Sequence, residues 1–235
     1  MTTDITIDRR FNGPPDSAQG GYVAGLLAES LGGSNVEVTL RRPPPLGTPL
    51  SVANERDTAR LLDGETLLAE ARRLAVETDV PGPPSFEEAA LAARNYPGLE
   101  HHPFPTCFAC GPDRSEGDGM RLSAGPMPDR NLTATPWVPS PSLSVDGRTV
   151  SPESVWAALD CPSGWAATEF SPGREAVLGR IAARIERRLI PRFRYIITSW
   201  PLGHDGRKMY AASAVFDEDR ALHALALATW IQIRS

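Results

Sequence analysis

The sequence predicts an α+β protein in which a central helix wrapped by an antiparallel sheet occurs twice in tandem. Three observations predict this class: the composition, a pattern that is written twice along the chain, and two helices with few charges. Glycine and proline make up 20 and 23 of the 235 residues, a content typical of strands joined by tight turns. Hydrophobic residues make up 41% of the chain, which is enough for a substantial core.

The first repeat is predicted to begin with an edge strand within residues 1–12 (MTTDITIDRRFN), followed by a loop rich in Gly and Pro. An apolar helical run then covers residues 22–31, and from residue 35 apolar and polar residues alternate. Residues 43–47 form a predicted turn, and Asp63-Gly64 between two apolar runs is a hairpin signal. A strand series therefore follows the first helix.

The second repeat shows the same order. An apolar helical run covers residues 154–167, and Asp205-Gly206 and residues 217–219 mark two further hairpins. An Arg-Arg pair stands shortly before a proline in both halves, as Arg41-Arg42 and as Arg187-Arg188. We therefore predict a tandem duplication with repeats at 1–79 and 107–235, joined by a linker at 80–106 that holds a short helix at 86–94. The alternative is a single β-rich domain whose halves are similar by chance.

The two central helices are dominated by Ala, Gly and Leu and are apolar nearly all round. A helix of this kind must be buried. Its small side chains also let a curved sheet approach closely, which an amphipathic surface helix does not require.

Composition excludes several classes of function. The net charge of −5 and the pI near 5.4 argue against a broad nucleic-acid surface. The N-terminal residues do not read as a signal peptide, and the longest apolar run, 221–233, is interrupted and shorter than the roughly 20 residues a membrane helix needs. We expect a cytoplasmic protein without membrane or nucleic-acid partners, and the odd count of 3 cysteines favours free thiols.

Two motifs in the second half resemble a known group of enzymes. Cys107-Phe108-Ala109-Cys110-Gly111, followed by Gly-Met-Arg-Leu at 119–122, is similar to the Cys-x-x-Cys-Gly…Gly-Leu-x-Leu segment of many phenylacetate-pathway-type thioesterases of the hot-dog-fold superfamily. Those proteins then carry His-Gly-Gly, six residues and Asp on the central helix. Here residues 151–153 read Ser-Pro-Glu and the same spacing leads to Asp160, so this half keeps the carboxylate and lacks the glycines.

The first half shows the complementary pattern. Gln19-Gly20-Gly21 resembles the glycine element of acyl-CoA thioesterase II-type double hot-dogs, but six residues further on stands Ala28, with Glu29 one residue out of register. In hot-dog thioesterases the site forms where two units meet. The resemblance therefore implies one intact composite site, made of Gly20, Gly21 and Asp160, and one inactive counterpart of Glu153 with Ala28.

This resemblance implies a hydrolase that cleaves an acyl-CoA or acyl-carrier thioester, with no cofactor other than coenzyme A as part of the substrate. Thioester hydrolysis builds negative charge on the carbonyl oxygen, which preorganised N–H groups stabilise. Gly20 and Gly21 lack Cβ and allow close approach, and Asp160 would act as a general base or as a nucleophile. The implied partner is a small acyl thioester, and we expect either a monomer with an internal pseudo-dimer or a homo-oligomer.

Asp160 also has a purely structural interpretation. An Asp in an apolar helix can form a hydrogen bond with a neighbouring backbone group. Pro162 removes one helical N–H and so leaves the backbone carbonyl of Ala158 without its usual donor. Five further residues are candidates for substrate binding: Asn12, Gln19, Tyr22, Trp156 and Arg188.

Other chemistries fit the sequence less well. Cys107-x-x-Cys110 with His101 and His102 upstream could bind zinc, but a second Cys pair is missing, so we expect no metal and a core position for Cys161. An acyl-binding protein without catalysis remains an alternative function, because each family motif is individually incomplete. An enoyl-CoA hydratase would need a histidine on a central helix, and all four histidines lie outside both helices.

Overall fold

The computed structural model describes residues 2–168 and 175–233. Its strands form one antiparallel sheet of 11 strands in the order β1-β3-β4-β5-β2-β8-β11-β10-β9-β7-β6. The strands are β1 Thr2–Thr6, β2 Val36–Leu40, β3 Pro49–Asn54, β4 Thr58–Asp63, β5 Thr66–Arg73, β6 Gly125–Met127, β7 Leu132–Trp137, β8 Ala176–Ile185, β9 Tyr195–Asp205, β10 Lys208–Asp217 and β11 Leu222–Gln232. The helices are α1 Gly20–Glu29, α2 Phe86–Ala93 and α3 Pro152–Ala167, with short 3-10 helices at Arg9–Phe11, Pro97–Leu99 and Pro141–Leu143.

The two halves of the sheet have the same strand order. In the N-terminal half β1 pairs with β3, the hairpin strands β3, β4 and β5 follow, and β5 pairs with β2. In the C-terminal half β7 pairs with β9, the strands β9, β10 and β11 follow, and β11 pairs with β8. The halves join where β2 pairs antiparallel with β8, from Val36 opposite Ala183 to Thr39 opposite Arg180.

The predicted hairpins are present. Asp63 pairs with Thr66 around Gly64, whose φ of +56° lies in the left-handed region that favours glycine. Residues 205–208 turn in the same way around Gly206. The predicted N-terminal edge strand is β1, which ends the sheet on one side, although residues 9–11 of that segment form a 3-10 helix.

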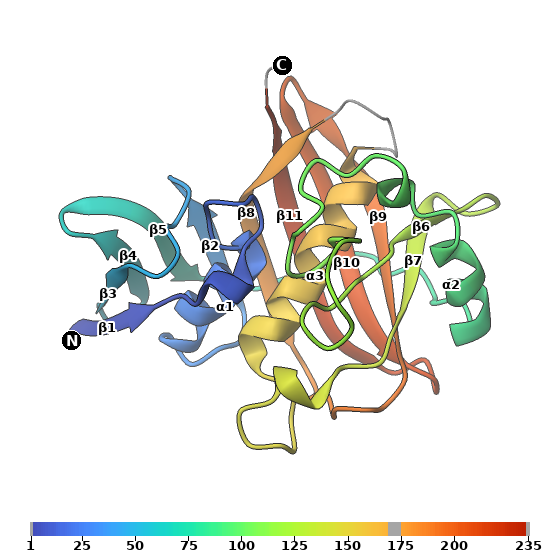
Figure 1. Cartoon of the computed structure of the whole chain (residues 1–235), viewed down its shortest axis with the longest axis horizontal. Coiled ribbons are helices and arrows are strands. Elements are labelled where there is room, and N and C mark those ends of the chain that lie inside the picture. Colours follow the sequence, from blue (N-terminus) through green and yellow to red (C-terminus); the bar gives the residue numbers. More distant parts are fainter. Residues whose placement is uncertain (1, 169–174, 234–235) are drawn as a thin grey trace.

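Helices α1 and α3 lie side by side against one face of the sheet, which curves around them (Figure 1). Both are buried over most of their length, as their apolar sequences predict. The helix continues through Pro162, and the Oγ–H groups of Ser163 and Ser213 donate to the carbonyls of Asp160 and Leu159, each at 2.6 Å. These hydroxyls supply hydrogen bonds to the turn that precedes the proline.

The predicted short helix of the linker is α2, which begins with a capping box formed by Ser85 and Glu88. It packs against β6 and β7 at the C-terminal edge of the sheet (Figure 1). Successive side chains of β10 point to opposite faces of the sheet, and those that share an apolar cluster with α2 point away from α3. Ala212 and Ala214 pack in the same apolar cluster as Ala89 and Ala92 of α2. Within the described ranges, no helix is long and apolar enough to cross a membrane.

Candidate active site

The contact between α1 and α3 brings Asp160 to the N-terminus of α1. The Oδ2 atom of Asp160 accepts hydrogen bonds from the backbone N–H of Gly21 at 2.7 Å and from Nε2 of Gln19 at 2.5 Å. Gln19 is the N-cap of α1, and its Oε1 accepts from the N–H of Tyr22 at 2.6 Å. The Gln19 amide therefore caps its own helix with one end and holds the carboxylate of the other helix with its second end.

The two helices approach this closely because α1 carries glycines where they touch. A Cβ on Gly21 would lie 2.5 Å from Asp160 Cβ and 2.6 Å from the carbonyl oxygen of Trp156. A Cβ on Gly25, one turn further along, would overlap the backbone of Glu153. The missing side chain at residue 21 lets its N–H reach the carboxylate directly.

Asp160 is buried, with 2% of its surface exposed. Burial raises the pKa of Asp160 to about 8, whereas the hydrogen bonds from Gly21 and Gln19 act to lower it. Its second oxygen, Oδ1, is buried and accepts no hydrogen bond from the residues that the structure describes. A buried carboxylate oxygen without a protein partner is a position that a water molecule or a ligand would satisfy.

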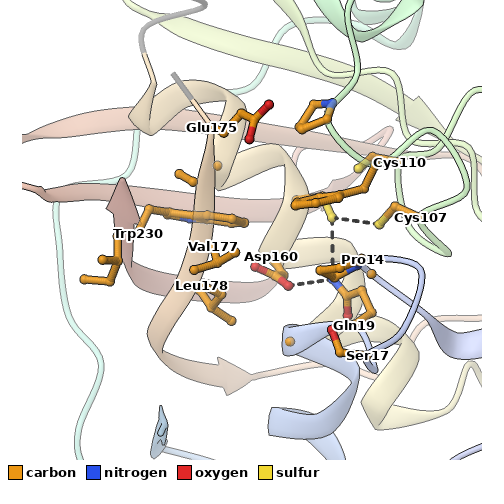
Figure 2. Close-up of a pocket in the computed structure, with 18 of the residues that line it drawn as sticks. Pro14, Ser17, Gln19, Cys107, Cys110, Asp160, Glu175, Val177, Leu178 and Trp230 are labelled. Atoms are coloured by element: carbon orange, nitrogen blue, oxygen red, sulfur yellow. Dashed lines mark hydrogen bonds between the residues drawn. The ribbon is translucent and has the colours of Figure 1, made fainter. Parts of the chain in front are cut away.

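Asp160, Gln19 and Gly20 all line a cavity of about 600 Å³, a size typical of small-molecule sites. Figure 2 shows Asp160 and Gln19 close together in this cavity, with Val177, Leu178 and Trp230 along its β8–β11 side. The backbone N–H of Gly20 has no hydrogen-bond acceptor among the described residues. It is therefore the N–H at the start of α1 that remains for a ligand oxygen, since Gly21 already serves Asp160.

The other residues that line the cavity include apolar or aromatic side chains, arginines, and the three cysteines with His102. Apolar and aromatic side chains form much of the wall, and the cations Arg41 and Arg42 also line the cavity. Both arginines are exposed to solvent, and Arg41 forms a salt bridge with Glu70. The three cysteines and His102 line the cavity as well, and the further lining residues include Gly13, Pro14, Ser17, Ala18, Leu40, Phe104, Gly164, Trp165 and Thr168.

Among the sequence-predicted site residues, Gly20, Gln19 and Asp160 line the cavity and Gly21 contacts Asp160 directly. The other four candidates lie elsewhere. Asn12 donates to Gly13 O and Thr106 Oγ1, Tyr22 stacks on Phe11 at 4.0 Å, and Trp156 is completely buried in the core. Arg188 is exposed to solvent near Glu29. None of these four residues lines the cavity.

Sequence reasoning did not single out several wall residues. Trp230 comes from the last strand, and its Nε1–H donates to Ser163 Oγ at 2.9 Å, which fixes the indole beside α3. The sequence indicates His102 only together with the Cys-x-x-Cys pair, as a possible zinc ligand, and its Nε2 lies 3.2 Å from Cys110 Sγ in the wall of the cavity. Gly164 follows Asp160 by about one helical turn, and this spacing is the one signal that could have placed residue 164 on the same face.

Comparisons with known proteins support the fold. No protein-family model matches the chain, and no curated protein matches its sequence. Among solved structures, a presumed thioesterase from Novosphingobium aromaticivorans is similar with a TM-score of 0.67 and 12% identity, over 99% of this chain and 96% of that chain. A conserved protein of unknown function with a hot-dog fold from Alicyclobacillus acidocaldarius is similar with a TM-score of 0.56 and 7% identity, over 100% and 94% of the two chains.

The chain has a hot-dog fold. Acyl-CoA thioesterase II TesB2 from Mycobacterium marinum shares this fold with a TM-score of 0.58 and 10% identity, over 93% of this chain and 90% of that chain. These identities are low, so the likeness concerns the arrangement of strands and helices, and the chemistry has to be argued from the site itself.

Proposed function

We propose that the chain is a double hot-dog thioesterase that hydrolyses an acyl-CoA or acyl-carrier thioester at one composite site between its repeats. The proposed repeats are 1–79 and 107–235, with 80–106 as linker. Support comes from the strand order, which is the same in β1 to β5 around α1 as in β7 to β11 around α3. The similarity to acyl-CoA thioesterase II TesB2 favours the same class of substrate.

One observation carries the proposal. The carboxylate of Asp160 from the second repeat and the N-terminus of α1 from the first repeat meet in the wall of a single cavity, with Gly21 N at 2.7 Å from Asp160 Oδ2. A base and a free backbone N–H, that of Gly20, therefore border the same space. General-base hydrolysis of an ester or thioester requires this pair of groups.

The reaction follows from these positions. Asp160 takes a proton from a water molecule while the water oxygen forms a bond to the thioester carbonyl carbon, and the carbonyl oxygen accepts from the N–H of Gly20. The C–S bond then breaks, the acid is released, and the thiolate leaves with the proton that Asp160 held. The donors of Gly21 and Gln19 stabilise the carboxylate form that accepts the proton.

The wall of the cavity suits an acyl thioester of this kind. Leu178, Trp165 and Trp230 offer an apolar surface to an acyl chain. Arg41 and Arg42 place positive charge beside the same cavity, where they can meet phosphate groups of the carrier.

Hydrolysis of a panel of acyl-CoA esters tests the proposal, with Asp160→Asn compared with Glu153→Gln. Both carboxylates lie on α3 opposite a glycine of α1, so the second variant is a matched control. Asp160→Asn should lower kcat/KM by about 10²–10⁴-fold, whereas Glu153→Gln should retain activity. Equal loss in both variants, or unchanged activity in Asp160→Asn, would overturn the assignment of Asp160.

A single turnover in ¹⁸O-labelled water separates the two roles open to Asp160. If Asp160 activates water, the label enters the released acid and never the protein. If Asp160 attacks the thioester, the thiolate leaves and a mixed anhydride forms, and hydrolysis of this anhydride at the Asp160 carbonyl puts the label into the protein carboxylate.

A second function, binding of an acyl group without turnover, is favoured by one observation. The N–H of Gly21 donates to Asp160, so the carbonyl of a bound thioester is offered one backbone donor in place of two. Tight acyl-CoA binding by the wild type, with no hydrolysis across the panel, would select this alternative.

A further inference from the structure

The three cysteines of the chain meet at one point beside the cavity. Cys107 and Cys110 lie on the loop after the linker and Cys161 lies on α3, 54 residues after Cys107. Their Sγ atoms all lie within 4.8 Å of one another, and those of Cys107 and Cys161 are 3.7 Å apart. The chain contains only 3 cysteines, so their convergence from two distant segments points to a shared role.

The sulfur positions match a zinc site. Zn²⁺ binds thiolate sulfur at about 2.3 Å with tetrahedral angles, which places two ligand sulfurs about 3.8 Å apart. The pair Cys107–Cys161 already has this separation at 3.7 Å, and the limit of 4.8 Å on the other pairs requires side-chain shifts of at most about 1 Å.

Cys107 lies in a tight turn that points its thiol at the other two cysteines. Its Sγ is 3.7 Å from that of Cys161 and within 4.8 Å of that of Cys110. The N–H of Gly111 donates to Cys107 O at 2.9 Å and closes the turn. A Cβ on Gly111 would collide with the backbone of Cys107, so the tight turn requires glycine here.

His102 supplies a further polar contact. Its Nδ1 accepts from the N–H of Phe104 at 2.9 Å, so in the neutral ring the proton lies on Nε2, which is 3.2 Å from Cys110 Sγ. In this orientation Nε2–H donates to the sulfur, and His102 stabilises a thiolate from outside the ligand set.

We propose that Cys107, Cys110 and Cys161 bind one Zn²⁺ ion through three thiolates, with His102 as hydrogen-bond donor to Cys110. Binding displaces the three thiol protons into solvent and leaves one coordination position for water or a cavity ligand. All three cysteines line the cavity, which gives the ion a path to the site. Figure 2 shows Cys107 and Cys110 on the wall of this cavity beside Gln19 and Asp160.

This site differs from the expectation drawn from the sequence, which was no metal because a second Cys pair is missing. The third thiol comes from α3, one residue after Asp160. Gln19 links the two groups, since its Nε2 lies 2.5 Å from Asp160 Oδ2 and 3.5 Å from Cys161 Sγ. An ion here would tie the loop that carries Cys107 to α3 and fix the wall beside the carboxylate.

Titration of the reduced, chelator-treated whole chain with Co²⁺ alone, in the absence of oxygen, tests the site. The expected result is one ion per chain with an intense sulfur-to-cobalt charge-transfer absorption, and zinc should displace the cobalt and remove this absorption. Three thiols should react with a thiol reagent in the metal-free chain and none in the loaded chain. Absence of the charge-transfer absorption would overturn the proposal.

The variant Cys161→Ser is decisive, because Cys161 lies outside the Cys-x-x-Cys pair. It should weaken metal binding at least 100-fold, as should Cys107→Ser and Cys110→Ser, whereas the neighbouring control His101→Ala should bind like the wild type. Wild-type affinity in Cys161→Ser would refute a site of three thiolates.

A second measurement is independent of whether the variants fold. The ¹¹³Cd chemical shift of the cadmium-loaded wild type reports the number of bound sulfurs, and three are expected. A mass lower by two hydrogens after mild peroxide treatment, in a chain that never binds metal, would assign the cluster to a disulfide and contradict the proposal. Because neither readout depends on thioester hydrolysis, the result is separable from that of the proposed function.

Discussion

The contact between α1 and α3 has two ends, and each end sets a glycine of α1 against an acidic residue of α3. At one end Gly21 faces Asp160, and at the other Gly25 faces Glu153. Asp160 is buried, accepts two N–H donors and lines a cavity. Glu153 is half-buried and lies near Tyr22 and Glu29, whose pKa values are raised by burial and further by the Glu153 charge.

The difference between the ends comes from the helix terminus. Backbone N–H groups are free of intrahelical partners only in the first turn of a helix. Gly21 is in the first turn of α1, and the N-cap Gln19 adds a side-chain donor there, whereas Gly25 lies inside the helix. The same packing of glycine against an acid therefore gives a polar site at one end and only close helix packing at the other.

Among variants that compare the two ends of this contact, the largest effects on stability should come from adding one methyl group at either glycine. Gly21→Ala and Gly25→Ala both place a Cβ against the backbone of α3, so each should lower the free energy of unfolding by about 2–3 kcal/mol. Only Gly21→Ala pushes Asp160 away from its donors, so it should also lower kcat/KM by about 10²-fold. Denaturant unfolding and activity at a temperature where both variants are folded measure the two effects, and equal activity in the two variants would remove the distinction between the ends.

The N-caps of the two helices give a smaller contrast. Gln19→Leu removes the cap of α1 and one donor to Asp160, which should cost about 1–2 kcal/mol of stability and lower kcat about 10-fold. Ser151 is the N-cap of α3 and makes no capping hydrogen bond to the backbone, but its buried Oγ–H donates to Ser154 Oγ at 2.9 Å, so Ser151→Ala should cost about 1 kcal/mol of stability and leave kcat unchanged. Thermal unfolding and steady-state kinetics test both variants, and a kcat for Gln19→Leu equal to that of Ser151→Ala would mean that Gln19 does not position the carboxylate.

The smallest expected effect concerns the exposed arginines of the two halves. Arg42 lines the cavity and Arg188 does not, although both belong to an Arg-Arg pair at similar places in the sequence. Arg42→Ala should raise KM for acyl-CoA about 3–10-fold at low salt, with a smaller effect at high salt, because an exposed charge is screened. Arg188→Ala should leave KM unchanged, and the opposite ranking would place the phosphate contacts at the other end of the helix pair.

Much of the fold could be predicted from local signals. Turn residues such as Asp63-Gly64 and Asp205-Gly206 fix hairpins by their own backbone preferences, and the nearly uncharged helices can only be buried. The repeat pattern predicts a short strand before the second helix, and β7 takes this place, although Pro136 hides its bounds in the sequence. Strand β6 was not predicted, since Pro126 interrupts the strand pattern there. The sequence also predicts the helix α2, but it does not predict which strands α2 packs against. An amphipathic pattern shows that one side of a helix is buried, and it does not identify the partner of that side.

The site could be predicted in part for a similar reason. Spacing and resemblance singled out Gly20, Gly21 and Asp160, and the structure brings these residues together. Asn12, Tyr22 and Trp156 are close to them in the sequence but point elsewhere, into hydrogen bonds and ring contacts that depend on the packed chain. The third thiol of the cysteine cluster was missed because spacing along the chain does not report convergence between segments 54 residues apart.

The pairing of β2 with β8, here called the seam, joins the two halves of the sheet and decides whether either half can exist alone. It leaves β1 and β6 as the outermost strands of the described sheet, and both are short. Cutting the chain in the linker and separating the pieces would uncover the seam strands, and each would present a row of unpaired amide and carbonyl groups. Isolated fragments should therefore self-associate or recombine with each other, and genetic truncation to one half should yield insoluble material.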